Sequence, residues 1–362
     1  MSLSLTVAVD ANGADAGPAE VARGAVLAAE SGVNVLIFGP AREMGSLPES
    51  VEVVDAPLSI AKSADPARAV RLHPDASIVQ AWRAVADGHA QAVVTGGSTG
   101  AALAAGLFTV KRARGIHRPA LAALVPMPDH PFLLLDAGAN VIVRPEHLVQ
   151  FAHMGAAFMR AALGVAHPRV ALLSNGEEAE RGREEIVAAH AALSGDAGLG
   201  LHFVGNIEGF AIGSGAADVI VTDGFTGNVA LKVMEGTSAA IFRAVRSSAH
   251  ASPRAALGGL LLKPALGDLR NTVDPEAQGG AVLLGLRAVG VMAHGSFSAP
   301  GFGRAVELAA QAIRNDLLGL TLSQLDAAHA LRPPPPGAEA AVAPRAPEPS
   351  DATPSSAPAE AP

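Results

Sequence analysis

Five segments of the chain combine glycine with short polar side chains in the manner of anion-binding loops. Each follows a short apolar run, and together they comprise residues 10–18, 95–100, 136–140, 174–178 and 222–228. Glycine frees backbone N–H groups to point at a ligand, and a helix that follows the loop adds partial positive charge. One such loop is weak evidence, because the same residues also make ordinary turns. Five of them predict a site for an anion of phosphate size.

Two of these loops supply the predicted phosphate cradle. It comprises Gly97, Ser98, Thr99, Thr226, Gly227 and Asn228. Lys232, about one helical turn further on, would either balance the charge of phosphate or lie in solvent as an ordinary helix lysine. Arg181 would either bind phosphate through two nitrogens or pair with a nearby glutamate.

Four acidic or amide side chains in three of these loops are further candidates. Asp136, Asn140 and Asp223, like Asp10, would orient donors or transfer protons. Acids at strand ends cap helices just as often, so both interpretations stay open.

Several classes of function are excluded by what the chain lacks. It has no cysteine, which rules out a thiolate nucleophile, a disulfide and a cysteine metal site. Neither glycine loop has the spacing of a P-loop or of a dinucleotide-binding turn. A formal charge of -8 argues against nucleic acid as a partner. Neither a metal ion nor a cofactor is therefore predicted.

The elements that must position these loops are short apolar runs separated by alanine-rich helical stretches. The runs cover residues 5–9, 33–38, 51–54, 92–95, 121–125, 132–135, 170–173, 201–204 and 219–221. Nearly continuous apolar runs are typical of strands covered on both faces. The pattern predicts an α/β fold with a doubly wound, mostly parallel sheet, in which ligands bind beyond the carboxyl ends of the strands.

One large domain, residues 1–332, accounts for this pattern, and 49% hydrophobic residues suffice for its core. Residues 333–362 hold ten of the 26 prolines and are predicted to be a disordered tail. The sequence shows neither a leader peptide nor an apolar run long enough to span a membrane, which indicates a cytoplasmic protein.

Two further segments have the character of contact surfaces. A helical hairpin is predicted at about residues 248–275; its leucines, Leu257, Leu260, Leu261 and Leu262 among them, would lie on a membrane surface or against a second subunit. Residues 111–118 form the densest basic stretch, which is either a solvated turn or a docking patch for an acidic carrier protein.

Residues 218–232, with the sequence DVIVTDGFTGNVALK, closely resemble the signature of the bacterial phosphate acyltransferases of phospholipid synthesis. Further similar motifs occur in the same order at residues 97–101, 118–121, 136–141, 148–155, 176–178, 207–209 and 279–285. The resemblance spans roughly residues 5–315. It implies a Rossmann-like fold similar to those of phosphate acetyltransferases and isocitrate dehydrogenases, with a projecting helical hairpin.

The resemblance implies that inorganic phosphate attacks a long-chain acyl-acyl-carrier protein, giving acyl phosphate for phosphatidic acid synthesis. Phosphate is itself the nucleophile, so the missing thiol is no obstacle. His294, in a His-Gly-Ser stretch that matches the family, would protonate the departing thiolate or serve as a structural histidine. The resemblance also implies a homodimer in peripheral contact with the membrane and with a membrane glycerol-3-phosphate acyltransferase.

The first loop departs from the family pattern, because Asn12 and Ala14 stand where methionine and glycine are usual. A positive φ at Ala14 would strain the loop. Two alternatives to the main hypothesis are a phosphate acyltransferase for short-chain acyl-coenzyme A and a weakly active paralogue that binds carrier protein or membrane as a scaffold.

Overall fold

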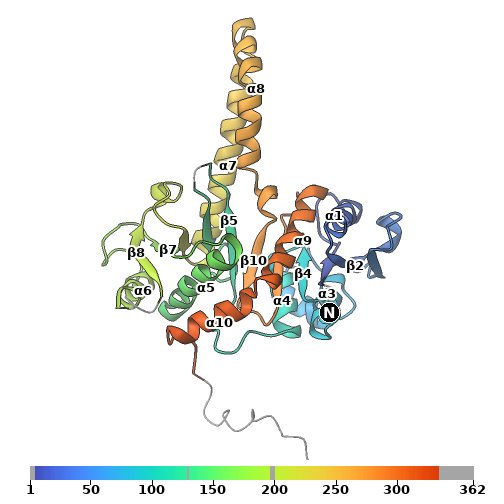
Figure 1. Cartoon of the computed structure of the whole chain (residues 1–362), viewed down its shortest axis with the longest axis horizontal. Helices are drawn as coiled ribbons and strands as arrows, with labels where there is room; N and C mark the ends of the chain where they lie inside the picture. Colours follow the sequence, from blue (N-terminus) through green and yellow to red (C-terminus); the bar gives the residue numbers. More distant parts are fainter. Residues whose placement is uncertain (1–4, 129, 196–199, 334–362) are drawn as a thin grey trace, which may run out of the picture.

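A computed structural model describes residues 5–128, 130–195 and 200–333 of the chain. Figure 1 shows a broad body from which a pair of long helices projects. Within these residues, one sheet of eleven strands has the order β3-β2-β1-β4-β11-β10-β5-β6-β9-β7-β8. Most neighbouring strands are parallel, which confirms the predicted doubly wound, mostly parallel sheet. The predicted tail, apart from Pro333, lies outside the described residues.

The strands are β1 Thr6–Asp10, β2 Asn34–Gly39, β3 Val51–Asp55, β4 Ala92–Thr95, β5 Ala120–Val125, β6 Phe132–Leu135, β7 Arg169–Leu173, β8 His202–Ile207, β9 Val219–Val221, β10 Ala281–Leu284 and β11 Val289–Met292. The α-helices are α1 Pro18–Glu30, α2 Pro66–Leu72, α3 Ser77–Ala86, α4 Thr99–Thr109, α5 Pro145–Leu163, α6 Glu184–Gly195, α7 Gly224–Ala249, α8 Pro253–Thr272, α9 Ala299–Arg314 and α10 Leu317–Ala327.

Strand β6 shows why the apolar runs form a sheet that is covered on both faces. Successive side chains of a strand point to opposite faces. Leu133 and Leu135 accordingly pack in one core with α1, α5 and α9, whereas Phe132 and Leu134 pack in a second core with α2, α3 and α4. All four side chains are buried, so a polar residue at any of these positions would face a core.

Strands β10 and β11 were not predicted, and the sheet reverses direction on both sides of β10 and again between β5 and β6. The antiparallel pairings are β11 with β10, β10 with β5, and β5 with β6. Three reversals therefore separate β4 from β9, and these two strands run in opposite directions. The loops after β1, β4 and β11 leave the sheet at one end, and those after β6, β7 and β9 leave it at the other. The two halves of the predicted phosphate cradle follow β4 and β9, so they do not leave the sheet together.

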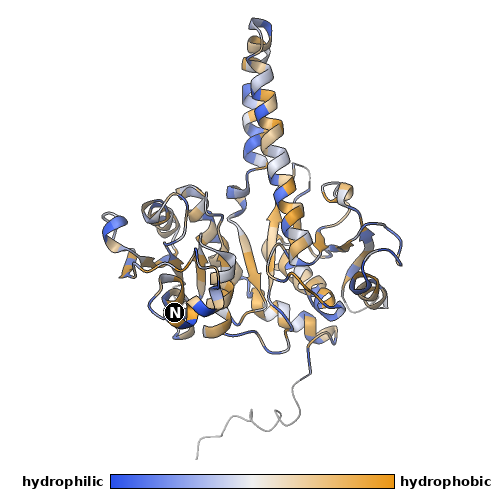
Figure 2. Ribbon diagram, turned by 180° about the vertical axis from the view of Figure 1, so that it is seen from behind, coloured by the Kyte–Doolittle hydropathy of each residue, from blue (hydrophilic) through white to orange (hydrophobic). Residues whose placement is uncertain are grey.

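The projecting hairpin consists of α7 and α8, and Ser252 caps α8 by accepting a hydrogen bond from the Ala255 N–H at 3.2 Å. The predicted range, residues 248–275, holds only the turn and the second arm, because the first arm is the distal part of α7. Within α7 only Gly224 and Gly227 are buried, and in α8 no residue is. Figure 2 shows hydrophobic residues along both exposed arms. No helix in the described ranges combines the length and apolarity needed to cross a membrane.

Candidate functional site

The carboxylate of Asp136 organises the loop that follows β6. Its two oxygens accept hydrogen bonds from the backbone N–H groups of Leu121, Gly138, Ala139 and Asn140 at 2.8–3.1 Å, and from Asn140 Nδ2 at 2.7 Å. Burial raises the pKa of Asp136, and the hydrogen bonds oppose that shift. The carboxylate therefore occupies the nest of N–H groups that was predicted to hold an anion. Asp136 positions this loop and leaves it little capacity to bind phosphate through its amides.

Asp223 has the same role at the start of α7. One oxygen accepts hydrogen bonds from the backbone N–H groups of Phe225 and Thr226 at 3.0 Å. The other accepts a hydrogen bond from the Thr226 hydroxyl at 2.7 Å and forms an ion pair with Arg183. Burial alone would raise the pKa of Asp223, but the hydrogen bonds from Thr226 and Arg183 outweigh burial and lower it. Asp223 is thus an ionised helix cap. Of the two interpretations left open for these acids, the geometry favours capping.

The loops after β6 and β9 interlock at Gly227. A Cβ atom at this position would overlap the carbonyl oxygen of Asp136 and lie 2.8 Å from Cγ2 of Thr222. Beyond this contact, the side chain of Asn228 lies beside Gly138 and is exposed. Gly227 therefore allows the backbone of α7 to approach the Asp136 carbonyl closely. The polar side chain of this turn that is exposed to a ligand is that of Asn228.

Arg183, which was not predicted from the sequence, is the arginine that contacts Asp223 in the loop after β9. Arg181 instead pairs with Glu178 at 3.6 Å, and both side chains are exposed. Arg183 contacts Asp223 and also Glu185 at 3.0 Å. Its link to Asp223 joins the loop after β7 to the loop after β9, across 40 residues of sequence. Arg183 and Asp223 come together because β7 and β9 are neighbours in the sheet, which the sequence alone does not show.

The loops after β1 and β4 form a second cluster around Asp10. Its carboxylate accepts the Thr95 hydroxyl at 2.7 Å and the Asn12 N–H at 3.2 Å. The Thr95 hydroxyl oxygen in turn accepts the Gly97 N–H at 3.0 Å. The enclosed space between these groups is about 10 Å³, enough for one water and too small for phosphate. Burial raises the pKa of Asp10 to about 6.

The altered first loop is accommodated without the expected strain. Gly13 has a φ of 90°, whereas Ala14 does not lie in the left-handed region. The Asn12 side chain is buried and donates to the Ala56 carbonyl at 3.0 Å and to the Ser77 hydroxyl at 2.9 Å. The departures at Asn12 and Ala14 therefore fit this structure.

Ser98 and Thr99 start helix α4 in this second cluster. Ser98 is its cap, since the hydroxyl accepts the Ala101 N–H at 3.1 Å. In the described part of the chain, no hydrogen bond joins residues 97–99 to residues 226–228. The joint cradle therefore stays a prediction: its two halves follow β4 and β9, which run in opposite directions, and no direct hydrogen bond joins them within the described ranges.

Helix α7 links the two clusters by bringing Lys232 to His294. The ammonium of Lys232 lies 3.5 Å from Nε2 of His294 and pairs with Glu235 at 2.7 Å. His294 follows β11, and the next residue, Gly295, accepts a hydrogen bond from the Asp15 N–H at 2.8 Å. Lys232 and His294 were predicted separately; the fold places them together on an exposed surface.

Ser296 orients the His294 ring. Its backbone N–H donates to Nδ1 at 3.3 Å, and its hydroxyl lies 2.7 Å from the same nitrogen. A nitrogen that accepts an N–H carries no proton of its own, so in the neutral ring the proton is on Nε2. In this tautomer Nε2 donates to solvent and cannot accept a hydrogen bond from Lys232, so the 3.5 Å approach of the ammonium is a close contact and not a hydrogen bond.

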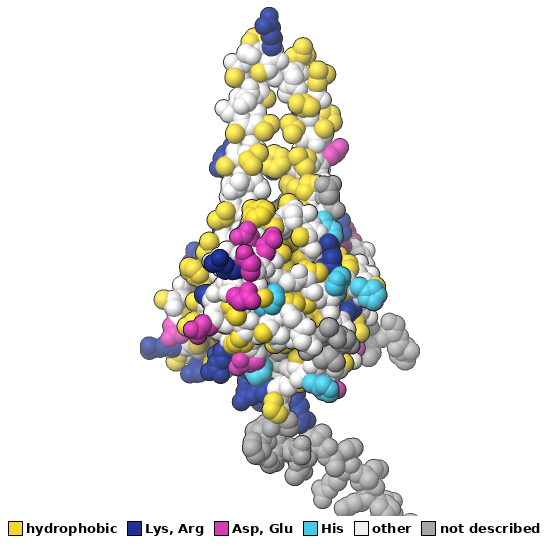
Figure 3. Space-filling view, turned by 90° about the vertical axis from the view of Figure 1, so that its left-hand side faces the viewer, with side chains coloured by type: hydrophobic (Ala, Val, Ile, Leu, Met, Phe, Trp, Pro, Cys, Tyr) yellow, Lys and Arg dark blue, Asp and Glu magenta, His cyan; other side chains and the backbone are white. Residues whose placement is uncertain are grey.

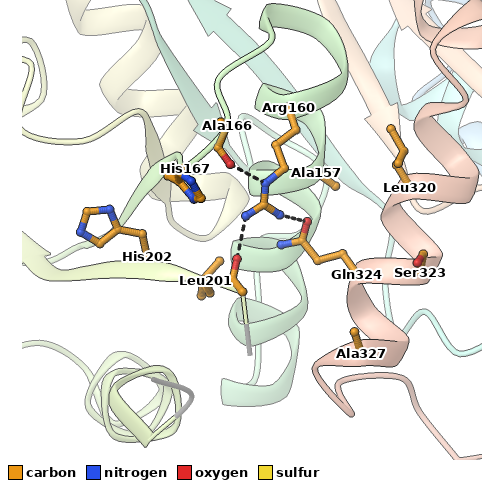
Figure 4. A pocket seen from close by; sticks show the side chains of 11 residues that line it. Ala157, Arg160, Ala166, His167, Leu201, His202, Leu320, Ser323, Gln324 and Ala327 are labelled. Atoms are coloured by element: carbon orange, nitrogen blue, oxygen red, sulfur yellow. Dashed lines mark hydrogen bonds between the residues drawn. The ribbon is translucent and has the colours of Figure 1, made fainter. Parts of the chain in front are cut away.

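A large open cavity lies away from both clusters. It has a volume of about 740 Å³ and lies between α5, α10 and the start of β8 (Figure 4). Arg160 spans it by donating to the carbonyls of Ala166 and Gly200 and to the side-chain oxygen of Gln324. Since this guanidinium already connects three segments, Arg160 is best explained as a structural clamp.

Comparisons with known proteins identify the family and agree with the fold. The family model described as "Fatty acid synthesis protein" matches residues 5–319. The phosphate acyltransferase of Pelotomaculum thermopropionicum is 41% identical over 321 residues, which cover 87% of this chain and 93% of that protein. The phosphate acyltransferase of Geobacillus thermodenitrificans is 40% identical over 328 residues, which cover 89% and 99%.

Solved phosphotransacetylases share the architecture. The enzyme from Streptococcus pyogenes superposes with a TM-score of 0.55 at 16% identity, covering 86% of this chain and 94% of that one. The enzyme from Staphylococcus aureus gives 0.54 at 16% identity, covering 85% and 94%. At this identity the likeness concerns the fold, and it confirms the predicted similarity to phosphate acetyltransferases.

Substituting Gly227→Ala should lower the free energy of unfolding by at least about 1–3 kcal/mol, because the new methyl overlaps the Asp136 carbonyl. Gly236→Ala is the matched control in the same helix, since nothing lies within 4 Å of its Cβ position. It should leave stability unchanged or raise it by up to about 1 kcal/mol. Urea denaturation measures both changes, and equal effects of the two substitutions would contradict the interlock.

Asp10 should make the fold less stable at neutral pH than at acidic pH. Its folded pKa of about 6 lies above the ordinary 3.8, so folding favours the protonated form. The contribution of Asp10 to the free energy of unfolding is therefore fully present below pH 3.8. It is lost as the pH rises through about 6, by up to about 3 kcal/mol. Asp10→Asn should remove this dependence in urea denaturation at about pH 4 and pH 7. Identical pH profiles for the variant and the wild type would refute the assignment.

Proposed function

This chain belongs to the family of fatty acid synthesis proteins and is a phosphate acyltransferase, and we propose that its acyl donor is a long-chain acyl-acyl-carrier protein. The observation that carries the phosphate chemistry is the approach of the Lys232 ammonium to 3.5 Å from His294, on an exposed surface where Gly295 lies beside the glycine loop after β4. The chain supplies a cation for the phosphate dianion and a proton donor for a leaving group. It has no cysteine for an enzyme-bound thioester.

In the proposed reaction an oxygen of hydrogen phosphate attacks the thioester carbonyl carbon. The C–S bond breaks, the acyl group remains on phosphate, and the proton of hydrogen phosphate ends on the carrier thiol. Lys232 and Asn228, one helical turn apart on α7, would hold the phosphate. His294 would pass a proton from Nε2 to the departing sulfur and regain one from phosphate. Most of the catalysis would come from positioning and from charge stabilisation.

The hairpin of α7 and α8 fits a membrane surface. Leu257, Leu260, Leu261 and Leu262 are 61%, 65%, 75% and 57% exposed. Arg254, Lys263 and Arg270 lie along the same helix, where anionic headgroups would attract them. The space-filling view in Figure 3 shows hydrophobic side chains along the projecting arms. Peripheral contact of this kind would bring a lipophilic acyl phosphate next to the bilayer in which an acyltransferase consumes it.

Thiol release from palmitoyl-acyl-carrier protein, measured with and without phosphate, tests the function. We expect release to require phosphate. Lys232→Ala and Asn228→Ala should each raise the KM for phosphate, the first by about tenfold, because a charge-assisted contact is lost. Lys263→Ala, on the exposed α8, is the control and should leave it unchanged.

Release that is independent of phosphate would refute the enzymatic assignment and favour a scaffold. Preference for short-chain acyl-coenzyme A would refute the proposed donor. Unchanged phosphate kinetics in Lys232→Ala would remove α7 from the site.

Replacing both Leu260 and Leu261 by serine should abolish sedimentation with phosphatidylglycerol vesicles, because the most exposed apolar area of α8 is lost. The fold should keep its stability, since neither side chain is buried. Sedimentation velocity of the wild type and the variant distinguishes the alternative. Loss of a dimer with unchanged vesicle binding would assign these leucines to a subunit contact.

A further inference from the structure

A basic surface gathers around the segment that precedes β5. It comprises Lys111, Arg112, Arg114, Arg118, Arg144, Arg287 and Arg332, all exposed. Three parts of the chain meet here through backbone contacts. Arg287 N donates to the Lys111 carbonyl at 3.0 Å, and Arg332 N donates to the Gly115 carbonyl at 2.8 Å. The basic stretch seen in the sequence is therefore the centre of a larger patch.

Two imidazoles lie within the basic surface. Burial is the largest cause of the lowered pKa of His117; Glu146 opposes it, and Arg332, Arg112 and Arg144 add to it. Burial likewise lowers the pKa of His147, opposed by Glu146 and helped by His117, Arg118 and Arg144. Several arginines therefore lie close to both rings, and their exposed charges would attract an anionic partner.

A metal ion fits this place less well than an anion does. Ligand atoms of His117, Glu146 and His147 lie within 4.8 Å of one another. The Arg144 N–H, however, donates to Nδ1 of His147 at 3.2 Å, which leaves the proton of the neutral ring on Nε2. Binding a cation through Nε2 would require this capping bond to break, and nearby arginines would repel the ion.

Two exposed apolar side chains lie at the edge of the basic surface, which also contacts the loop after β6. Val141 and Ile142 are 66% and 84% exposed and are separated from Arg144 by the buried Val143. Asn140, held by Asp136, donates to the Pro119 carbonyl at 2.7 Å, next to Arg118. Exposed apolar side chains that are rimmed by arginine are characteristic of protein contacts. A partner seated here would touch the Asp136 loop.

The basic surface and the hairpin lie at different ends of the molecule. The described chain ends at the base of the body, where α10 leads toward Arg332, whereas the hairpin rises from the top (Figure 1). In Figure 3, Lys and Arg side chains gather around that base. A protein bound at the base and a membrane at the hairpin would therefore not compete for space.

We propose that the basic surface docks the acidic carrier protein that delivers the acyl thioester. This inference rests on the proposed function, since it assigns the surface to the same acyl donor. The folded body of the enzyme has a net charge of about -5 by sequence, so an acidic partner is repelled overall. A local cluster of arginine restores attraction at one place and fixes the orientation of approach. Val141 and Ile142 supply the apolar contact at its edge.

The test compares charge reversal at Arg114, Arg118 and Arg332 with reversal at Arg83, an exposed arginine of α3. In the triple variant Arg114→Glu, Arg118→Glu, Arg332→Glu, the KM for palmitoyl-acyl-carrier protein should rise at least tenfold at low salt, with kcat nearly unchanged. The salt dependence of kcat/KM should also weaken. Arg83→Glu should change neither quantity.

A neutral thioester, octanoyl-N-acetylcysteamine, separates docking from chemistry because it carries no protein to dock. Its turnover should be equal in the triple variant and in the wild type, which also shows that the variant is folded. Ile142→Ser should raise the KM for the carrier substrate alone, since it removes the most exposed apolar side chain of the surface.

An unchanged KM for the carrier substrate in the triple variant would overturn the proposal. So would loss of phosphatidylglycerol vesicle binding with an unchanged KM, which would make this surface a membrane contact. Failure of the proposed function is distinct, because the wild type itself would then show no phosphate-dependent release from the carrier protein.

Discussion

The close approach of Gly227 to the carbonyl of Asp136 is the contact on which the site depends. It seats the first turn of α7 on the loop after β6, and the carboxylates of Asp136 and Asp223 hold the two loops in shape. From this fixed start α7 runs to His294, where it delivers Lys232, and continues into the hairpin. A side chain larger than hydrogen at residue 227 would displace the whole helix from its seat.

These carboxylates also hold the loops in shape from within the chain. Backbone N–H groups at strand ends attract anions, and here internal acids satisfy most of them. A loop that is already organised loses less conformational entropy when substrate arrives. The cost is that few amides remain for phosphate. The side chains of Lys232 and Asn228, both exposed on α7, are therefore the groups assigned to it.

The sequence predicted the strands with long buried runs, such as β6, and both parts of the Lys232–His294 pair. It missed β10 and β11, which are as short as β6 and gain their place from partners far away in sequence, Leu283 with Leu121 for example. Strand direction has no local signal, so the opposite directions of β4 and β9 could not be predicted. Arg183 was missed for a related reason, since its partner Asp223 lies 40 residues away. A capping acid and a proton-transferring acid look alike in sequence until their donors are located.

Helix α7 is one continuous element of 26 residues, about 39 Å long, and its first three turns, as far as Met234, pack on the body. It therefore has the geometry of a lever whose pivot is the packed segment from Gly227 to Met234. Lys232 lies within this pivot, and the leucine-bearing tip of the hairpin lies at the far end. A swing that carries the tip through several ångströms moves the ammonium by only a fraction of that distance. Movements of the hairpin thus reach Lys232 strongly reduced in amplitude, and its spacing to His294 is insulated from displacements of the tip.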